Sequence, residues 1–246
     1  MNHNFFKFVN KITLFDVISF FKINSDEFLK INDLRKINPK DFEIVDFLSL
    51  DNLKKNTLSF MSKKANDLSF ENYSVCLVDK DFPKNSNHDF IKIPVENPRL
   101  AFSNLINYFC IKKVNNKDQS RLKNNSIIFD SVKIGRNFKI GSFSEIKSNV
   151  VIGDNVTIEN GVTIYENCVV GDNCIIKNGV SLECSIINNS VIINQNSVIG
   201  KDGFGFVPIK EKTRIFFHIG AVIIGQNSYI GSNTNIVLLK VRPSLF

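Results

Sequence analysis

Residues 126–182 read SIIFDSVKIGRNFKIGSFSEIKSNVVIGDNVTIENGVTIYENCVVGDNCIIKNGVSL, and every sixth position of this stretch is aliphatic. A second column of mostly small or aliphatic residues lies two positions before the first. Turn residues recur between the columns: glycine often follows the aliphatic residue, and asparagine often lies three positions after it. The aliphatic column is Ile128, Ile134, Ile140, Ile146, Ile152, Ile158, Ile164, Val170, Ile176 and Leu182, and the asparagines include Asn137, Asn149, Asn155, Asn167 and Asn173.

A period of six decides the secondary structure. On an α-helix six residues turn through about 600°, so the aliphatic column would spread around the cylinder instead of forming one stripe. A strand would keep the column on one face, but a strand this long lies outside the usual range of about 3 to 10 residues. A parallel β-helix satisfies both demands, because each six-residue unit supplies one short strand and one corner. The sequence therefore predicts a mainly β fold built on a parallel β-helix.

The repeat is interrupted twice. Its first slip shortens the step from Leu182 to Ile187 to five residues. The second spans residues 201–217 and is predicted to be an excursion from the β-helix. It contains Asp202-Gly203-Phe204-Gly205-Phe206, in which the two glycines permit positive φ and close approach of the backbone. The period of six returns afterwards at Ile224, Ile230 and Ile236.

The first half of the chain has no repeat and predicts a small α/β domain. Thr13 followed by Asp16 resembles a capping box with Asp in place of Glu, and it predicts a helix over Phe15–Ile23. The β-rich run Tyr73–Val78 predicts a strand.

A second helix is predicted to begin at Pro98, with Asn97 as its cap, and Leu100, Ala101, Leu105 and Tyr108 follow at helical spacing. We divide the chain into an α/β domain over 1–113, a linker over 114–125, the β-helix over 126–236 and an aberrant tail over 237–246.

Composition limits the classes of function. With 246 residues, 43% of them hydrophobic, the chain can build a core in one or two domains. The net charge of +7 favours acidic partners such as phosphates, nucleic acid or an acidic protein. Because the basic residues are scattered and no nucleic-acid-binding module is recognisable, we expect no nucleic acid partner.

Neither a membrane span nor a metal site is expected. No apolar run approaches about 18 residues, and the start, MNHNFFKFVN, lacks the features of a signal peptide, so we expect a cytoplasmic protein with no transmembrane segment. The cysteines are odd in number and show no CxxC spacing, which argues against disulfides and zinc. We expect buried free thiols at Cys76, Cys110, Cys168, Cys174 and Cys184.

Several motifs together resemble one family. The coils are followed by KDGFGF (201–206), HIGAVIIG (218–225) and IGSNTNI (230–236), and LSFMS (58–62) and IPVENPRLAF (93–102) lie in the first domain. In order and spacing, over nearly the whole chain, they resemble the UDP-3-O-acylglucosamine N-acyltransferases of lipid A biosynthesis. This resemblance implies a homotrimer of left-handed parallel β-helices, each preceded by a small α/β domain of the uridine-binding type.

The resemblance also implies an activity. Members move a 3-hydroxyacyl chain from acyl carrier protein to the 2-amine of UDP-3-O-acylglucosamine, with a histidine as general base, backbone donors for the oxyanion, and no metal or cofactor. An amine that attacks a thioester must lose a proton, which a neutral imidazole can accept near pH 7. The acidic carrier protein and the UDP pyrophosphate both suit the positive net charge.

The implied site transfers only in part. Phe60 matches the family's aromatic residue that stacks on uracil, while Lys63 and Asn66 stand where the family has Asn and Tyr, so half of the aromatic clamp is missing. A core position is the alternative for Phe60. The family's general-base histidine would lie beyond Phe246, so no residue here is predicted to be catalytic, and His218 is expected to be structural or exposed.

The tail breaks the repeat. One permitted codon choice for Ile236–Phe246 (IVLLKVRPSLF), read from a preceding G, encodes Asp-Arg-Ser-Phe-Lys-Gly-Ser-Thr-Val-Ile-Ile, which restores a family motif and an aliphatic hexad. We therefore expect a C-terminally truncated, impaired acyltransferase whose tail is a frameshift product.

Two alternatives stay open. The first is a non-catalytic β-helix that binds UDP-sugar or acyl carrier protein, or assembles with intact subunits. The second, another hexapeptide acyltransferase or sugar-nucleotide enzyme, is disfavoured by the GFGF excursion and the first domain.

Overall fold

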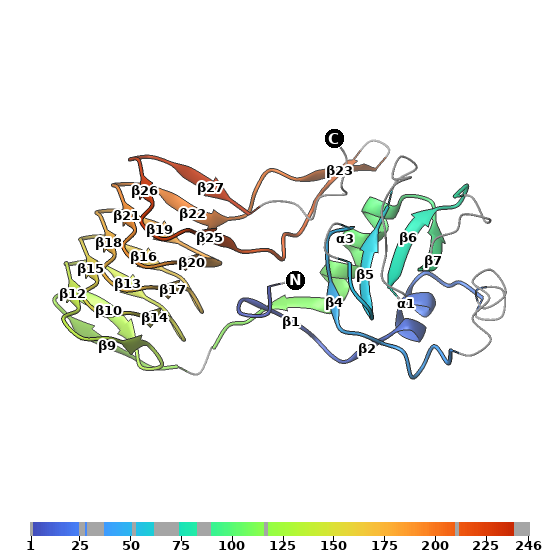
Figure 1. Ribbon diagram of the computed structural model, residues 1–246, viewed down its shortest axis with the longest axis horizontal. Coiled ribbons are helices and arrows are strands. Elements are labelled where there is room, and N and C mark those ends of the chain that lie inside the picture. Colours follow the sequence, from blue (N-terminus) through green and yellow to red (C-terminus); the bar gives the residue numbers. More distant parts are fainter. Residues whose placement is uncertain are drawn as a thin grey trace.

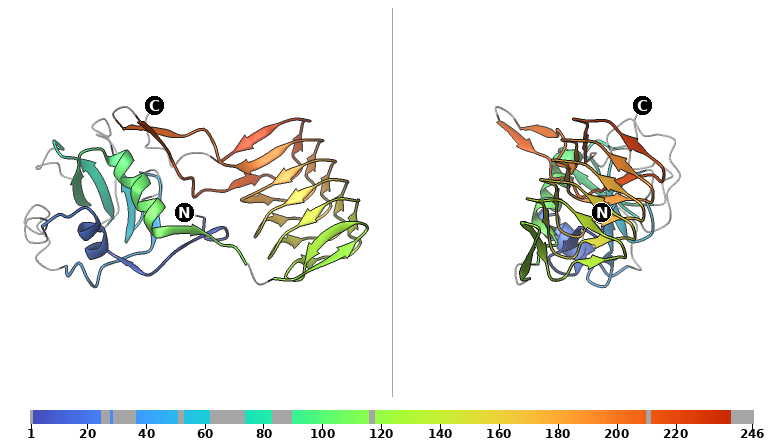
Figure 2. Two further views of the ribbon diagram at one scale, coloured as in Figure 1. Left: turned by 180° about the vertical axis from the view of Figure 1, so that it is seen from behind. Right: turned by 90° about the vertical axis from the view of Figure 1, so that its left-hand side faces the viewer.

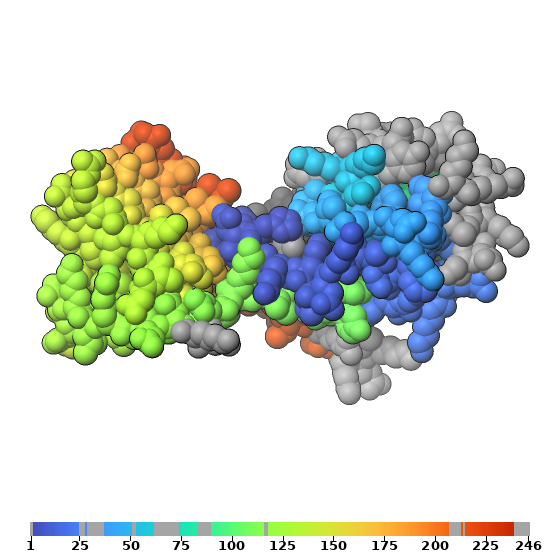
Figure 3. Space-filling view, turned by 90° about the horizontal axis from the view of Figure 1, so that it is seen from below, coloured from blue at the N-terminus to red at the C-terminus, as the bar shows by residue number. Residues whose placement is uncertain are grey.

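The computed structural model describes residues 2–24, 28, 37–50, 53–61, 74–82, 90–115, 118–209 and 212–238. It shows two lobes side by side, a β-helix and an α/β domain (Figures 1 and 2). Seen from below, the N-terminal residues fill the waist between the lobes (dark blue in Figure 3). The hexad repeat forms one of these lobes, and the residues before it form the other.

The β-helix consists of three parallel sheets, and regular neighbouring strands within a sheet lie three hexads apart in the chain. The first sheet contains β10 (Ser126–Phe129), β13 (Glu145–Ile146), β16 (Thr163–Ile164), β19 (Ser181–Leu182), β22 (Val198–Lys201) and β27 (Asn235–Val237). The second contains β11 (Lys133–Ile134), β14 (Val151–Ile152), β17 (Val169–Val170), β20 (Ser185–Ile187) and β25 (Val222–Ile224). The third contains β12 (Lys139–Ile140), β15 (Thr157–Ile158), β18 (Ile175–Ile176), β21 (Ile192–Ile193) and β26 (Tyr229–Ile230).

The predicted columns form the interior and the corners of this β-helix. Every member of the aliphatic column is buried except Ile134 of the first coil, which is half-buried. The asparagines at the predicted turns all adopt positive φ, a conformation that asparagine tolerates better than most residues. Their φ values are 56° at Asn137, 60° at Asn149, 59° at Asn155, 64° at Asn167 and 57° at Asn173.

One strand lies inside the predicted linker. β9 (Ser120–Lys123) pairs antiparallel with β10 and covers the outer edge of the first sheet at the first coil. All four residues of β9 are exposed, so the strand carries no alternation of buried and exposed positions. Sequence periodicity gives no signal for such a strand, because none of its side chains is buried.

The α/β domain is built on a four-stranded parallel sheet in the order β4 (Asp46–Phe47), β5 (Thr57–Phe60), β6 (Val75–Asp79) and β7 (Ile91–Val95). α3 (Pro98–Phe109) packs on this sheet. Two short antiparallel pairs complete the domain: β1 (Phe6–Phe8) with β8 (Cys110–Lys112), and β2 (Ile12–Thr13) with β3 (Glu43–Ile44).

Both predicted helix caps are confirmed. Thr13 and Asp16 form the two reciprocal bonds of a capping box at the start of α1 (Leu14–Phe20), and the Asn97 side chain accepts a hydrogen bond from the Leu100 N–H. Within α3, Ala101 and Leu105 face the core, whereas Tyr108 at the C-terminal end is 64% exposed. The helical spacing places Tyr108 on the same face as Ala101 and Leu105, but at the end of α3 that face is no longer covered by the core.

The predicted excursion is a hairpin of β23 (Phe206–Ile209) and β24 (Lys212–Ile215) that leaves the coils between β22 and β25. Of the predicted tail, Val237 belongs to β27 and Leu238 is buried, while residues 239–246 lie outside the described residues. All five cysteines are buried free thiols, as predicted. In the described parts of the chain, no helix is long and apolar enough to cross a membrane.

Candidate functional site

The irregular steps of the β-helix fall at one corner, between the first and second sheets. Regular coils place six residues between the inward aliphatic residues of these sheets, as from Ile164 to Val170, but the step from Leu182 to Ile187 has five. Cys184 closes this shorter corner with a φ of 43°. One coil further on, the 201–217 excursion leaves from the same corner.

A glycine makes this corner possible. Gly200 has a φ of 78°, and a Cβ built on it would lie 1.6 Å from the backbone oxygen of Glu183 in the coil below. The pairing of β22 with β27 shifts at this residue, so that Lys201 instead of Gly200 stands opposite Val237. No other residue type fits this backbone position.

The α/β domain docks along this corner, coil by coil. The Asn167 side-chain amide donates to the Lys113 carbonyl over 2.8 Å, and the Asn2 N–H donates to the Ile219 carbonyl over 2.9 Å. At the excursion, the Arg99 guanidinium donates to the Phe206 carbonyl over 3.0 Å. The two lobes are therefore joined by contacts far apart in the sequence.

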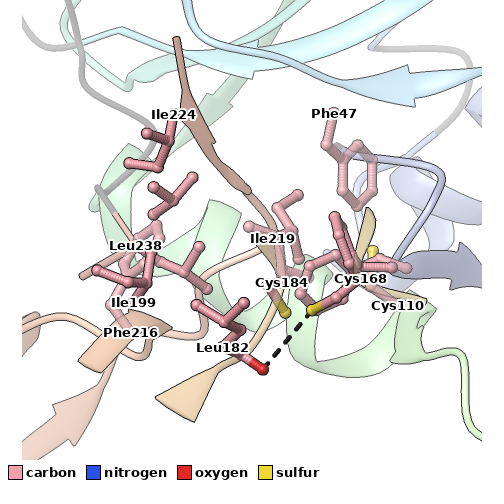
Figure 4. Close-up of a cluster of buried hydrophobic side chains, with 14 of the residues drawn as sticks. Phe47, Cys110, Cys168, Leu182, Cys184, Ile199, Phe216, Ile219, Ile224 and Leu238 are labelled. Atoms are coloured by element: carbon pink, nitrogen blue, oxygen red, sulfur yellow. Dashed lines mark hydrogen bonds between the residues drawn. The ribbon is translucent and has the colours of Figure 1, made fainter. Parts of the chain in front are cut away.

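The junction also has an apolar centre, shown in Figure 4. Phe47 and Cys110 of the α/β domain lie beside Cys168, Cys184 and Ile219 of the β-helix side, and all five are buried. The Cys168 thiol donates to the Leu182 carbonyl over 3.6 Å (dashed in Figure 4). These residues belong to one core that runs continuously through both lobes.

Beside this apolar centre lies a cluster of charged side chains. The Glu183 side chain is 15% exposed, and its carboxylate forms ion pairs with Lys112 of β8 and Lys201 of β22. The Lys201 Nζ lies 2.5 Å from the carboxylate Oε2. The Lys201 ammonium lies 3.6 Å from the centroid of the Tyr165 ring, and the Lys147 ammonium lies 4.7 Å from the same centroid. Lys147, Tyr165, Glu183 and Lys201 follow one another at equal intervals of three hexads, one per coil. We call these four residues and Lys112 the corner cluster.

The ion pairs of the corner cluster shift the pKa values of Glu183, Lys112 and Lys201. Burial raises the pKa of the Glu183 carboxyl, but the hydrogen bonds from Lys112 and Lys201 outweigh it, and the net pKa lies below the ordinary value. For Lys112 and Lys201, burial lowers the pKa and the bonds to Glu183 outweigh it, so that both are raised. All three groups therefore stay charged near neutral pH.

The GFGF loop follows the corner cluster directly. A Cβ on Gly203 would lie 2.4 Å from the Leu238 carbonyl oxygen, so glycine is required there for close backbone approach. The rings of Phe204 and Phe206 meet edge to face with centroids 4.6 Å apart, and Phe204 is 92% exposed. This loop presents an aromatic pair at the surface of the junction.

His218 is a buried structural residue of this loop. It is 2% exposed, and its Nε2 lies 3.2 Å from the Gly203 carbonyl oxygen. Its Nδ1 is buried with no hydrogen-bond partner among the described residues. Of the other histidines, His3 lies 3.2 Å from Asp46, and His88 is outside the described residues.

Of the three predicted substrate-binding residues, the structure describes only Phe60. Phe60 ends β5, is 2% exposed and packs on Phe102 with ring centroids 5.0 Å apart. Lys63 and Asn66 lie outside the described residues. Stacking of Phe60 on uracil thus stays a prediction, and the ring's place in the core is what the structure shows.

The three thiols between the lobes, Cys110, Cys168 and Cys184, are not activated as nucleophiles. Burial raises the pKa of Cys110, Cys168 and Cys184 to about 12, so none of them is an activated nucleophile at neutral pH. Across the described parts of the chain, no group of three or more His, Cys, Asp or Glu residues could hold a metal ion.

The corner cluster was not found by inspection of the sequence. Its signal is a column of its own: the position after the inward aliphatic residue of the first sheet carries Phe129, Lys147, Tyr165 and Glu183, one in every third hexad. At the other two corners this position is often glycine, as at Gly135, Gly153 and Gly171, so the charged and aromatic column could have marked the docking corner.

Comparison with known proteins relates the chain to one group of enzymes. A family model described as bacterial transferase hexapeptide (six repeats) matches residues 131–166 and 149–184. The UDP-3-O-acylglucosamine N-acyltransferase of Rickettsia typhi (strain ATCC VR-144 / Wilmington) is 42% identical over 201 residues, and that of Rickettsia prowazekii (strain Madrid E) is 41% identical over 201 residues. The chain is a homologue of the UDP-3-O-acylglucosamine N-acyltransferases.

The two matches each cover 80% of this chain and 57% of the relative, so the chain spans little more than half the length of these N-acyltransferases. Since the matched stretch is longer than either lobe alone, the homology includes both the α/β domain and the β-helix. Among solved structures, the acetyltransferase domain of PglB from Neisseria gonorrhoeae FA1090 in complex with acetyl coenzyme A has a TM-score of 0.36 at 12% identity, covering 75% of this chain and 94% of that chain. We infer nothing from so low a score.

Proposed function

We propose that this chain acts in the N-acylation step of lipid A biosynthesis, where a 3-hydroxyacyl chain passes from acyl carrier protein to the 2-amine of UDP-3-O-acylglucosamine. The observation that carries the proposal is the 42% identity to a relative of that name over a stretch that includes both lobes. The hexapeptide β-helix and the α/β domain docked on it support the proposal.

The reaction forms an amide bond and breaks a thioester. The amine attacks the thioester carbon, the carbonyl oxygen carries negative charge in the transition state, the amine loses a proton and the carrier protein's thiol leaves. A base must accept the proton from nitrogen. Because His218 is buried against Gly203, we do not assign this role to it.

The outward faces of the β-helix support assembly with further copies, and we propose a homotrimer. In the second sheet the outward positions are apolar from the second coil onward, and in the third sheet they become so toward the C-terminal coils. The first sheet carries polar residues at most of the matching positions, including Glu145, Thr163 and Ser181. The apolar positions are Val151, Val169, Ile186 and Ile223 in the second sheet, and Ile175, Ile192 and Tyr229 in the third.

We also propose the partners and the location that the family name suggests. The net charge of +7 suits both the acidic carrier protein and the pyrophosphate of the UDP-sugar. Phe60, Lys63 and Asn66 remain our candidates for the uridine site. The cytoplasm, where nucleotide sugars and acyl carrier protein are made, is the proposed location.

A second function is favoured by one observation. His218, the histidine beside the GFGF loop, is buried and therefore cannot accept a proton from a bound amine. A β-helix protein that binds UDP-sugar or acyl carrier protein without turnover fits this arrangement as well.

One experiment separates the two functions. The purified full chain is mixed with 3-hydroxyacyl carrier protein and UDP-3-O-acylglucosamine, and the amide product is followed by mass spectrometry. Binding of UDP-N-acetylglucosamine and of acyl carrier protein is measured in parallel by calorimetry. Product formation supports the acyltransferase, while binding without product supports the second function. If the chain is folded by circular dichroism and shows neither, both are wrong.

A further inference from the structure

The α/β domain carries an open pocket. Its volume is about 500 Å³, and it lies between the β1–β2 connection, α1 and the end of α3. Three phenylalanines and a tyrosine line it together with polar side chains. The lining residues are Val9, Asn10, Lys11, Phe15, Asp16, Ser19, Phe20, Tyr108 and Phe109.

Apolar side chains around this pocket face solvent. Val9 is 50% exposed, Tyr108 64% and Ile111 42%. The Tyr108 ring lies 5.2 Å from that of Phe20 and 4.8 Å from that of Phe109, centroid to centroid, so the rings form one continuous surface. Val9 and Ile111 project from the same side of the β1–β8 pair, because Lys7 stands opposite Ile111 and side chains alternate along a strand. Exposed apolar groups that gather in this way mark an interaction site.

Lysines surround the aromatic surface. Lys7 pairs with Ile111 across β1 and β8, Lys11 lines the pocket, and the Lys40 ammonium lies 5.3 Å from the centroid of the Phe15 ring. Two carboxylates also lie here: Asp16 closes the capping box with Thr13, and Glu43 pairs with Lys11 over 2.8 Å, so Lys7 and Lys40 are the main cations of the face. We call Lys7, Lys11 and Lys40, together with the exposed Tyr108 ring and the half-buried rings of Phe15, Phe20 and Phe109, the lysine–aromatic face.

We propose that the lysine–aromatic face docks the protein on an anionic phospholipid surface. The aromatic and aliphatic side chains enter the headgroup region, where tyrosine places its apolar ring below and its hydroxyl in water. The lysines contact lipid phosphates, and their long stems let the ammonium groups reach them. This role does not depend on the acyl transfer proposed above.

Two features favour a lipid surface over other occupants. The charged donors of the face are lysines, which act as mobile point charges, whereas a defined anionic partner is usually held by the rigid fork of arginine. A second copy of the chain meeting face to face would bring Lys7, Lys11 and Lys40 against their own equivalents, and like charges would oppose the contact.

Vesicle flotation with the full chain tests the proposal. Vesicles of phosphatidylcholine with about 30% phosphatidylglycerol are compared with phosphatidylcholine alone. Each lysine near an anionic surface contributes about fivefold to binding, so we expect Lys7→Gln with Lys40→Gln to weaken binding about 25-fold. Tyr108→Ser should weaken it severalfold. Lys139→Gln and Phe143→Ser on the β-helix are the matched controls, since Lys139 and Phe143 are exposed there as well.

The outcomes separate the possible occupants. Binding only to anionic vesicles, weakened by the first two variants and unchanged in the controls, supports the proposal. No flotation, or equal loss in the control variants, overturns it. Binding to poly-glutamate but not to vesicles would assign the face to an acidic protein, and a change of mass in sedimentation caused by Tyr108→Ser would assign it to a second copy. Either result would overturn the lipid proposal.

Discussion

The β-helix and the α/β domain both hold parallel strands, but they specify them differently. In the β-helix each strand is short, and its inward side chain packs beneath an equivalent one three hexads later in the chain. The α/β domain instead collects its core from unrelated positions, with Phe6, Phe47 and Phe102 all fully buried. The β-helix is thus specified by a short local pattern that recurs in every hexad. The α/β domain is specified by single residues that meet over long distances in the sequence.

The largest expected effect is at Gly200, in the corner where the β-helix departs from its regular repeat. Gly200→Ala places a methyl group against the Glu183 carbonyl, at a φ that disfavours every side chain. We expect the free energy of unfolding to fall by about 4 kcal/mol or more, as measured by urea denaturation.

Gly161→Ala is the matched control. Gly161 also has positive φ, but the nearest atom to an added Cβ lies 4.0 Å away, so only the conformational cost of about 1 to 2 kcal/mol remains. Equal losses in the two variants would show that the close approach at Gly200 is unimportant.

The next prediction asks whether the two lobes unfold together. Ile164→Ala in the β-helix and Leu105→Ala in α3 each remove a fully buried side chain and should each cost about 3 kcal/mol. Because the core is continuous across the junction, we expect both variants to shift one common transition, monitored by circular dichroism during urea unfolding. Two separate transitions, each sensitive to one variant, would contradict this.

A smaller effect concerns the charged contact between the lobes. The pKa of Glu183 is lowered in the fold, so its stabilisation is complete above the ordinary pKa of 4.5 and is lost as the pH falls through the folded value. Glu183→Gln should cost about 1 to 2 kcal/mol at pH 7 and flatten the loss of stability below pH 4.5. Unfolding free energies measured from pH 3 to pH 7 give both quantities.

Glu43→Gln serves as the comparison for Glu183. Glu43 pairs with Lys11, but the two side chains are 42% and 68% exposed, and such exposed pairs contribute little. If this variant changed the unfolding free energy at pH 7 as much as Glu183→Gln, the corner cluster would have no special role at the junction.

The smallest effect lies at a regular corner. Asn155 has a φ of 59°, accepts a hydrogen bond from Asn137 over 2.9 Å and donates one to Asn173 over 3.1 Å. We expect Asn155→Ala to lower the unfolding free energy by about 1 kcal/mol, and Asn155→Gly to lower it by less, since glycine tolerates positive φ. The melting temperatures of the two variants check this order. A glycine variant less stable than the alanine variant would show that positive φ is not what makes Asn155 favourable.

The β-helix was predictable because each of its rules is repeated. The aliphatic column, the asparagine turns, the shortened step from Leu182 to Ile187 and the excursion after Lys201 can all be identified in the sequence and appear in the structure. In the α/β domain, only features encoded within a few residues were predictable, such as the Thr13–Asp16 capping box and the Asn97 cap.

The junction was not predictable, because its contacts join residues far apart in the sequence. Lys112 meets Glu183 across 71 positions, and Arg99 meets the Phe206 carbonyl across 107. No periodicity connects such pairs. The proposed uridine residues Phe60, Lys63 and Asn66 came from a family motif alone, which says nothing of how deeply Phe60 is buried.

The shortened corner at Cys184 has a consequence for protein engineering. A regular β-helix offers equivalent corners on every coil, and a second domain has no preferred height at which to attach. The missing residue, together with Glu183 beside it and Gly200 above it, makes one coil different from the rest. This corner specifies the coil at which the α/β domain docks. Shifting the shortened step and its flanking residues by three hexads in the sequence should therefore shift the docked domain by one coil.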